Sequence, residues 1–432
     1  MTSVWTETTH PKPRPSLQGD RSTDVLIIGG GLAGILTAHL LSEAGLCPIV
    51  VEAKTIGDGV TKHTTAKITA QHGLIYADLI KRFSIDKAKQ YYNANTAAIG
   101  RYRTLAAHFP CDFEEKTAYI YSINDRQKLE RDAEAYHKLG IPGTIEETPA
   151  LPFSTVGALA LKHQAQFHPL KLLHALADGL EVYENTFVRK IDGRAAYTAA
   201  GKITARHIVL ATHYPLINIP GLYFMKLYQH RSYVAALEGA SLIDGIYLDE
   251  AKTGLSFRTY GDLLFVGGGS HRTGKRGGGY TALESFLAKT YPTAKIKYRW
   301  ATQDCMSLDK VPYIGRHRVG AEALYVATGF NKWGMTGSMV AAELLTSLIV
   351  HGKSEYEALY NPQRNMLSGQ LCINLAAATA GLVSPGSPRC AHMGCKLHRN
   401  HAEQTWDCAC HGSRFDAKGH VINNPAKKGL RR

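Results

Sequence analysis

Residues 24–52 constrain the fold of this chain more than any other stretch, and they read DVLIIGGGLAGILTAHLLSEAGLCPIVVE. An apolar run predicts a buried strand, leucines at helical spacing predict a helix, and a second apolar run predicts another strand. Gly29, Gly31 and Gly34 form the pattern G-x-G-x-x-G between the first strand and the helix. Such glycines permit a tight turn, the approach of a pyrophosphate to the backbone, and close packing of helix on sheet.

Glu52 stands at the end of the second strand, 18 residues after Gly34. A carboxylate at this place can accept hydrogen bonds from ribose hydroxyls, and the helix N-terminus would face the phosphates. The alternative is a glycine-rich turn inside an ordinary α/β domain. The order of strand, glycines, helix, strand and acidic residue favours a dinucleotide site.

The chain has 432 residues, enough for two or three domains, and 50 Lys plus Arg against 36 Asp plus Glu give a formal charge of +14. This surface favours acidic partners, anionic substrates or anionic lipid. Because no nucleic-acid-binding module is recognisable, the preferred interpretation is a soluble basic surface without such a role. No apolar run reaches the ~20 residues of a membrane span, and the polar N-terminus lacks the apolar core of a signal peptide. We expect a cytoplasmic protein with no nucleic-acid partner and no transmembrane segment; peripheral membrane contact is left open.

The periodicity of the remaining chain predicts an α/β fold, α+β overall. Helices are expected at residues 85–109, 126–139, 172–180 and 338–350. Strands are expected at residues 117–122, 208–212, 232–237, 246–249, 255–260, 263–267 and 324–328. The strand-rich region 222–300 predicts an antiparallel sheet with one face free to cover a cofactor.

Three further motifs carry a family resemblance: HTTAK at residues 63–67, VLAT at 209–212 and ATGFNKWGMTGS at 327–338. With the glycine-rich unit, they resemble FAD-dependent oxidoreductases of the D-amino-acid oxidase and glycine oxidase type. The resemblance implies FAD, a discontinuous Rossmann-like domain and an antiparallel substrate domain over the flavin. The residues that it implies at FAD, beyond the glycines and Glu52, are Thr64, Thr65, Lys67, Val188, Gly329, Asn331, Trp333, Gly334 and Met335. A surface position for Lys67 and a core position for Trp333 are the alternatives.

The motifs also suggest a domain organisation. We expect a flexible leader at residues 1–22, the oxidoreductase at 23–352, a connector at 353–384 and a C-terminal module at 385–432. Within the oxidoreductase, FAD-binding parts at about 23–72, 155–220 and 306–352 alternate with substrate-domain parts at about 73–154 and 221–305. The sequence Pro385-Gly386-Ser387-Pro388 predicts a hinge before the module.

Oxidation of an amine by a flavin depends on substrate orientation, often by a cation that binds a substrate carboxylate. Arg258 and Arg272 are the candidates, and Arg258 is preferred because strands are more precise platforms than loops. The candidates for further hydrogen bonds are Tyr233, Tyr260, Tyr313 and His271. A solvated surface position is the alternative for each of these residues.

The C-terminal tail pairs Cys390-x-His392 with Cys408-x-x-His411 across 15 intervening residues. Two cysteines and two histidines on two short loops suit a Rieske [2Fe–2S] cluster, with thiolates on one iron and imidazoles on the other. Tetrahedral zinc with the same ligands is the alternative, but zinc modules usually repeat C-x-x-C or H-x₃₋₅-H spacings.

The tail resembles the Rieske ferredoxin family in these two loops. The resemblance implies a disulfide between Cys395 and Cys410, which would link the loops. A full Rieske domain carries a further β base, and the tail is expected to be a shortened module that lacks it.

Together these features predict an FAD-dependent oxidoreductase that oxidises an amine or amino acid. Electrons would pass through the Rieske cluster to an acceptor, either a protein or a quinone. A cluster that carries one electron at a time favours a dehydrogenase. The alternatives are an H₂O₂-forming oxidase with a structural cluster, and a redox-sensing binding protein with a vestigial active site.

Overall fold

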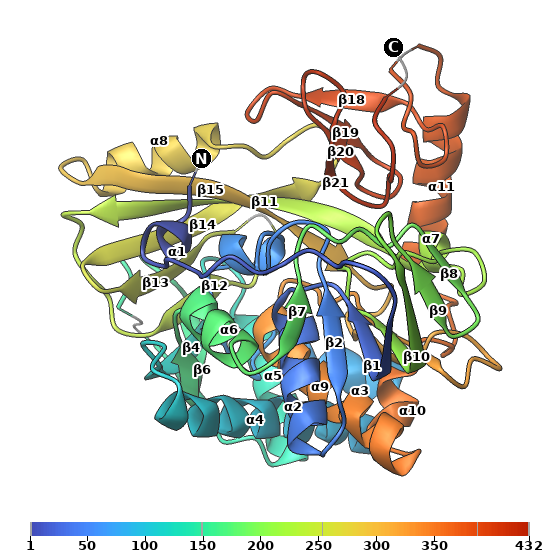
Figure 1. Cartoon of the computed structure of the whole chain (residues 1–432). Helices are drawn as coiled ribbons and strands as arrows, with labels where there is room; N and C mark the ends of the chain where they lie inside the picture. Colours follow the sequence, from blue (N-terminus) through green and yellow to red (C-terminus); the bar gives the residue numbers. More distant parts are fainter. Residues whose placement is uncertain (1, 148–149, 253, 387, 431–432) are drawn as a thin grey trace.

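The computed structural model describes residues 2–147, 150–252, 254–386 and 388–430. Two large sheets form the body, and a small third sheet near the C-terminus stands on it (Figure 1). The predicted fold class is confirmed: a Rossmann-like unit, a second sheet and a small C-terminal module with its own sheet are all present.

The first sheet contains the glycine-rich unit, with strand order β16-β17-β10-β1-β2-β7 and with β8 and β9 beside β10. The pairs β17–β10, β10–β1, β1–β2 and β2–β7 are parallel, and β16 is antiparallel to β17. The bounds are β1 Arg21–Ile28, β2 Pro48–Val51, β7 Glu181–Tyr183, β8 Lys190–Asp192, β9 Ala195–Tyr197, β10 Lys202–Leu210, β16 Tyr313–Arg316 and β17 Leu324–Thr328.

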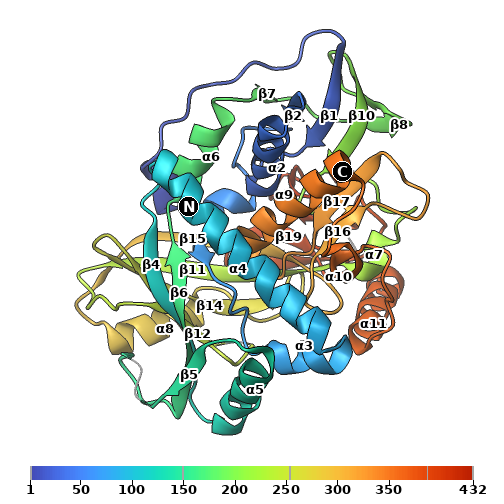
Figure 2. The same cartoon turned by 90° about the horizontal axis from the view of Figure 1, so that it is seen from below.

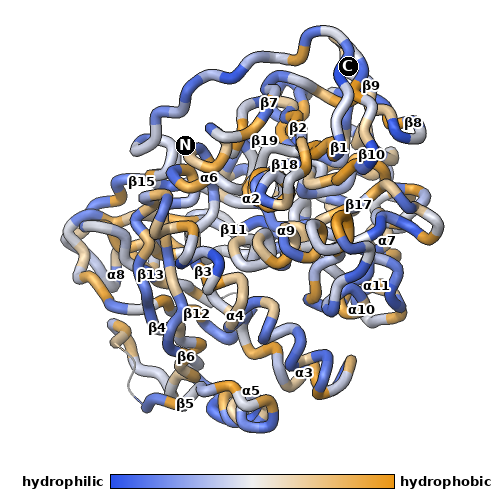
Figure 3. The backbone as a smooth tube through the Cα atoms, turned by 60° about the horizontal axis from the view of Figure 1, so that its bottom comes forward, coloured by the Kyte–Doolittle hydropathy of each residue, from blue (hydrophilic) through white to orange (hydrophobic). Residues whose placement is uncertain are grey.

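Two helices, α2 (Leu32–Glu43) and α9 (Gly334–His351), fill the core beside this sheet. Most of their residues are buried, and they are apolar on nearly all sides, as a helix surrounded by protein must be (Figure 3). Each starts at the carboxyl end of a parallel strand. Their N-termini therefore point to the edge of the sheet where nucleotides bind in such folds.

The second sheet has the order β15-β11-β14-β13-β12-β4-β6-β3, with β5 beside β6. Its bounds are β3 Lys67–Ile68, β4 Glu114–Ser122, β5 Gly143–Glu146, β6 Gly157–Gln166, β11 Tyr228–Glu238, β12 Ile246–Asp249, β13 Ser256–Tyr260, β14 Leu263–Arg272 and β15 Lys295–Met306. The pair β12–β4 is parallel, so the sheet is mixed rather than wholly antiparallel. β6 also belongs to this sheet, although residues 155–220 were assigned to the FAD-binding part.

The remaining helices cover the outside of the body, and α4 crosses its underside beside α3 and α5 (Figure 2). Their bounds are η1 Val60–His63, α3 Tyr76–Arg82, α4 Ile85–His108, α5 Arg126–Leu139, α6 Pro169–Ala177, α7 Tyr223–Lys226, α8 Thr281–Thr290 and α10 Glu357–Tyr360. Capping explains two of these starts: Ser84 accepts a hydrogen bond from Lys87 N–H, and Asp125 accepts one from Lys128 N–H.

The described residues from 2 to 20 are packed on the body, which differs from the flexible leader expected at residues 1–22. They form a short helix, α1 (Val4–Glu7), and lie along the body until β1 begins at Arg21. Trp5 is fully buried, and its indole Nε1 donates a 2.8 Å hydrogen bond to the Thr64 carbonyl. One large aromatic side chain therefore fixes an otherwise polar stretch.

The C-terminal module has one small sheet, in the order β18-β19-β20-β21, whose strands flank the two loops with the predicted ligands. The described residues of the tail contain no second sheet, as expected for a shortened module. A helix, α11 (Gly369–Val383), leads into β18 Leu397–Asn400, β19 Thr405–Cys408, β20 Arg414–Phe415 and β21 Val421–Asn423. Ser387 of the predicted hinge lies outside the described residues. Among those that are described, no helix is both long and apolar enough to cross a membrane.

Candidate active site and iron–sulfur site

A cavity of about 640 Å³ lies where the two sheets and the C-terminal module meet. It runs from Gly31 and Glu52 at the first sheet to Tyr233 and Lys332 beneath the second. Residues 421–427 of the module also line it. The cavity is thus built from three parts that are far apart in the sequence.

The three motif glycines have different surroundings. A Cβ atom on Gly29, whose φ is +117°, would collide with the Ala211 carbonyl, and one on Gly34 would collide with the Gly29 carbonyl. A Cβ on Gly31 would meet only Thr61 Oγ1, at 3.5 Å. Gly29 and Gly34 therefore serve close backbone packing, while Gly31 borders the open cavity at the start of α2.

Glu52 and Lys67 supply charge along the cavity wall. The Glu52 carboxylate accepts hydrogen bonds from the N–H groups of Gly30 (2.8 Å) and Lys54 (2.9 Å), and burial raises its pKa. Burial, with the nearby charges of Arg258 and Lys332, lowers the pKa of Lys67 to about 7. Lys67 has no ion-pair partner among the described residues, and a buried amine of this kind can bind an anion.

Most residues implied at the cofactor by the family resemblance line this cavity: Thr64, Thr65, Lys67, Val188, Trp333, Gly334 and Met335. Gly329 and Asn331 do not. The Asn331 amide is bonded to Ser307 and to the Gly329 carbonyl, so these residues shape the loop before α9 rather than face the cavity.

Arg258, the preferred substrate anchor, lies outside the cavity. Its guanidinium is fully buried and donates hydrogen bonds to the carbonyls of Thr65 (2.5 Å) and Ala66 (3.0 Å). It also packs on the ring of Trp5, 5.6 Å from the centroid. Arg258 therefore stabilises the HTTAK loop (residues 63–67) through its backbone carbonyls and does not face a substrate in the cavity.

The other predicted substrate residues are also dispersed, except Tyr233, which lines the cavity. Arg272 donates to the carbonyls of Ala409 and Cys410 in the C-terminal module. His271 stacks on Tyr233 with ring centroids 5.9 Å apart. The hydroxyl of Tyr260 bonds to Asp112, and the ring of Tyr313 lies under the Arg364 guanidinium.

The charged cavity residues that were not predicted from the sequence include Asp304 on β15 and Lys332 before α9. Protein surrounds Lys332, yet its side chain remains accessible to the cavity, and its Nζ is bonded to Ser232 Oγ (3.2 Å) and Ser270 Oγ (2.5 Å). Burial raises the pKa of Asp304 and lowers that of Lys332, and each charge partly offsets the shift of the other. The motif that contains Lys332 could have suggested it, whereas Asp304 stands in no recognisable motif.

The predicted cluster ligands come together in the C-terminal module. Cys390 and Cys408 are buried, and their thiols are hydrogen-bonded to each other. The ring centroids of His392 and His411 are 5.0 Å apart. Both Nδ1 atoms are buried without a hydrogen-bond partner among the described residues.

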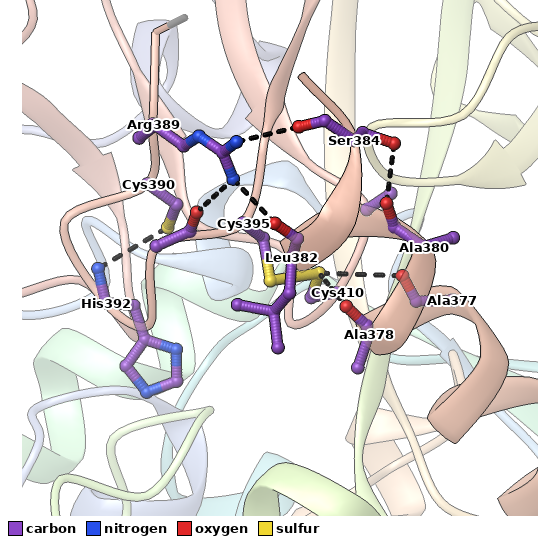
Figure 4. Close-up of a disulfide and its surroundings, with 12 residues drawn as sticks. Ala377, Ala378, Ala380, Leu382, Ser384, Arg389, Cys390, His392, Cys395 and Cys410 are labelled. Carbon is purple, nitrogen blue, oxygen red and sulfur yellow. Dashed lines mark hydrogen bonds between the residues drawn. A yellow bond between two sulfur atoms is a disulfide. The ribbon is translucent and has the colours of Figure 1, made fainter. Parts of the chain in front are cut away.

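Cys395 and Cys410 form a disulfide beside this group, the pairing implied by the Rieske resemblance (Figure 4). The sulfurs of Cys395, Cys408 and Cys410 lie within 4.8 Å of one another, but the disulfide leaves only Cys408 of these three free to bind a metal. The closeness of these three sulfurs therefore does not identify the metal ligands. Cys390, His392, Cys408 and His411 fit a [2Fe–2S] cluster better, because none of them is in the disulfide.

Comparison with known proteins agrees with this arrangement. The family FAD dependent oxidoreductase matches residues 24–348, and the Rieske [2Fe-2S] domain matches residues 368–432. The chain belongs to the FAD-dependent oxidoreductase family. This oxidoreductase carries a Rieske domain at its C-terminus, whose match begins earlier than the predicted boundary at residue 385.

The relatives of this FAD-dependent oxidoreductase include one with both parts. YhfW of Bacillus subtilis, named for a Rieske 2Fe-2S centre, is 34% identical and covers 99% of this chain and 97% of its own length. Gamma-glutamylputrescine oxidoreductase of Escherichia coli is 24% identical over 81% of this chain and 88% of its own length. Glycine oxidase of Geobacillus kaustophilus shares the fold, with a TM-score of 0.68 and 19% identity over 80% of this chain and 100% of that structure.

FAD and a [2Fe–2S] cluster are therefore the cofactors of this enzyme, and the geometry fits both. The open face of Gly31 and the cation of Lys67 suit a pyrophosphate, and Glu52 suits a ribose. For the cluster, the unpartnered Nδ1 atoms of His392 and His411 suit one iron and the two thiols suit the other.

The Rieske domain is held on the flavoprotein body by buried polar contacts. Gln229 Nε2 donates to the His411 carbonyl (2.8 Å), and Asn424 Nδ2 donates to the carbonyls of Thr212 (2.8 Å) and Tyr214 (3.1 Å). Arg231 of β11 and Glu403 of the module form a buried ion pair. In this structure these contacts hold the cluster site next to the cavity.

Proposed function

We propose that this enzyme oxidises an amine or amino acid in the cavity and passes the electrons to its Rieske cluster, from which a separate acceptor removes them one at a time. A bound flavin supplies two-electron oxidation, and a Rieske cluster supplies one-electron transfer.

The observation that carries the proposal is the position of Tyr214. This side chain is fully buried, lines the cavity, and packs edge-to-face against both histidines of the cluster site. Its ring centroid is 6.4 Å from that of His392 and 6.5 Å from that of His411. One aromatic ring therefore lies between the cavity and the two histidines of the cluster site.

The charged residues at the far end of the cavity support an amine or amino acid as substrate. The Asp304 carboxylate faces the cavity and can accept hydrogen bonds from a substrate ammonium group. Lys332, fixed by Ser232 and Ser270, can bind a carboxylate. The names of two similar proteins, gamma-glutamylputrescine oxidoreductase and glycine oxidase, refer to compounds with amino groups.

Anaerobic mixing of the holoenzyme with a panel of amines and amino acids tests the proposal. We expect the flavin absorbance to bleach with some member of the panel and the electron paramagnetic resonance (EPR) signal of the reduced cluster to appear afterwards. His411→Ala serves as the control, because it should lose the cluster signal and keep flavin bleaching. Flavin bleaching in the wild type without any cluster signal would instead support an oxidase with a structural cluster, and no bleaching with any compound would favour a sensor.

A further inference from the structure

A groove on the outer side of the cluster exposes one histidine ligand. Its volume is about 1390 Å³, and His392 lines it together with Asn218, Phe224 and Met393. His411 is only 3% exposed, and the Phe224 carbonyl accepts a hydrogen bond from its ring. Electrons that leave the cluster by the shortest path to the surface therefore leave beside His392.

The charged side chains that line this groove are all basic: Arg389, Lys418, Lys427 and Lys428. No Asp or Glu is among its described lining residues. Lys418, Lys427 and Lys428 are exposed, and none has an ion-pair partner in the described part of the chain. The nearest acid in sequence, Asp416, is bonded to His420 and to the N–H of Lys418.

Apolar side chains line the same groove. Ile219 is 75% exposed and Met393 is 43% exposed, and both line the groove. Apolar side chains together with charged ones of a single sign are the composition expected of a surface that docks a protein of opposite charge. The surface is concave around His392, which suits a convex protein better than a flat bilayer.

We propose that this groove docks an acidic one-electron carrier protein, which accepts electrons from the cluster beside His392. The inference rests on the proposed function and names the chemical class of the acceptor. Oxidation of one amine to an imine releases two electrons and two protons. Two carrier molecules are each reduced by one electron in succession, the cluster returns to its oxidised state each time, and the protons go to solvent.

The test uses one carrier protein in two forms of opposite net charge. Native cytochrome c is basic, and succinylated cytochrome c is acidic. The holoenzyme is reduced with one electron equivalent of dithionite, so the measurement does not depend on amine oxidation. We expect the succinylated form to be reduced faster than the native form at low ionic strength, with the difference decreasing as salt is added.

The double substitution Lys418→Glu, Lys428→Glu should slow reduction of the succinylated cytochrome roughly tenfold. It should also weaken binding of that cytochrome to the oxidised holoenzyme, measured by calorimetry. The control is Lys81→Glu, Lys89→Glu, which makes the same charge change at exposed positions on α3 and α4 and should alter neither quantity.

Equal rates for the groove variant and the control, or faster reduction of native cytochrome c at low salt, would overturn the proposal. Binding to anionic vesicles that is lost in the groove variant, with cytochrome rates unchanged, would assign the surface to a membrane instead. A failure of amine oxidation with docking intact would contradict the proposed function alone.

Discussion

Glu403 is the residue whose loss should most directly loosen the Rieske domain from the flavoprotein body. Its carboxylate lies between Arg231 of β11, with Nε 2.7 Å away, and Arg414 of β20, with Nη2 3.1 Å away. The side chains of Glu403, Arg231 and Arg414 are 12%, 7% and 3% exposed. Glu403→Gln keeps the size and one acceptor but leaves two buried guanidinium groups short of one negative charge.

The pKa of Glu403 gives the size of the effect. Burial alone would raise it, but hydrogen bonds and charges of Arg231 and Arg414 lower it from 4.5 to about 2. At 1.36 kcal/mol per unit, this shift corresponds to roughly 3 kcal/mol of stabilisation by the ionised form. Removal of one partner from a buried ion pair typically costs about 3–5 kcal/mol of stability, a range that agrees with the value from the pKa shift.

Urea unfolding followed by the visible circular dichroism of the cluster measures this loss. At pH 7 we expect Glu403→Gln to lower the free energy of unfolding of the Rieske domain by about 3 kcal/mol. Because the pKa of Glu403 is lowered in the folded protein, its stabilisation is complete above pH 4.5 and is lost as the pH falls towards 2. The wild type and Glu403→Gln should therefore have the same free energy of unfolding at the acid end of this range.

The control is Glu284→Gln, which breaks the surface pair with Arg299, whose side chains are 43% and 48% exposed. Such a pair contributes less than about 1 kcal/mol. If Glu403→Gln lost no more stability than Glu284→Gln, the Rieske domain would not be held by this buried network, and the reasoning would be refuted.

Three further substitutions test the individual sites. Gly31→Val should abolish FAD binding, since its side chain would enter the pyrophosphate cradle, and a fully yellow purified variant would contradict this. Asp304→Asn removes a charge-assisted hydrogen bond of about 1.5–3 kcal/mol, so kcat/KM for the amine should fall roughly ten- to hundredfold at unchanged FAD content. An unaltered kcat/KM would remove Asp304 from the substrate site. His411→Ala should remove the Rieske absorbance and about two irons per chain while FAD stays bound, and a retained signal would exclude His411 as a ligand.

Elements with local sequence signals were predictable. Strands at residues 246–249 and 324–328 and the helix at 126–139 occupy the predicted positions, because period and flanking turn residues define them. The FAD and Rieske parts were predictable because their motifs are short and contiguous in the sequence. The long strand β15 was not predicted, because its polar outer residues hide the alternation.

The sequence could not place side chains that depend on distant contacts. Arg258 stands on its expected strand, but the packing of Trp5 and of the HTTAK loop decides that it faces backbone carbonyls. Asp304 and Tyr214 belong to no motif, and only the assembled sheets bring them to one cavity. The ion pair between Arg231 and Glu403 spans 172 positions, a separation at which no local pattern can indicate contact.

We propose that electrons reach the cluster through the contact of Tyr214 with the two histidines. Freeze-quench EPR after anaerobic mixing with a substrate amine measures the rate at which the cluster is reduced. Tyr214→Phe keeps the ring and loses a hydroxyl that has no hydrogen-bond partner among the described residues, so it should match the wild type. Tyr214→Leu should slow cluster reduction and leave flavin bleaching unchanged, and Tyr223→Leu, in the same core cluster, serves as the packing control. Equal rates of cluster reduction in Tyr214→Leu and the wild type would contradict the claim.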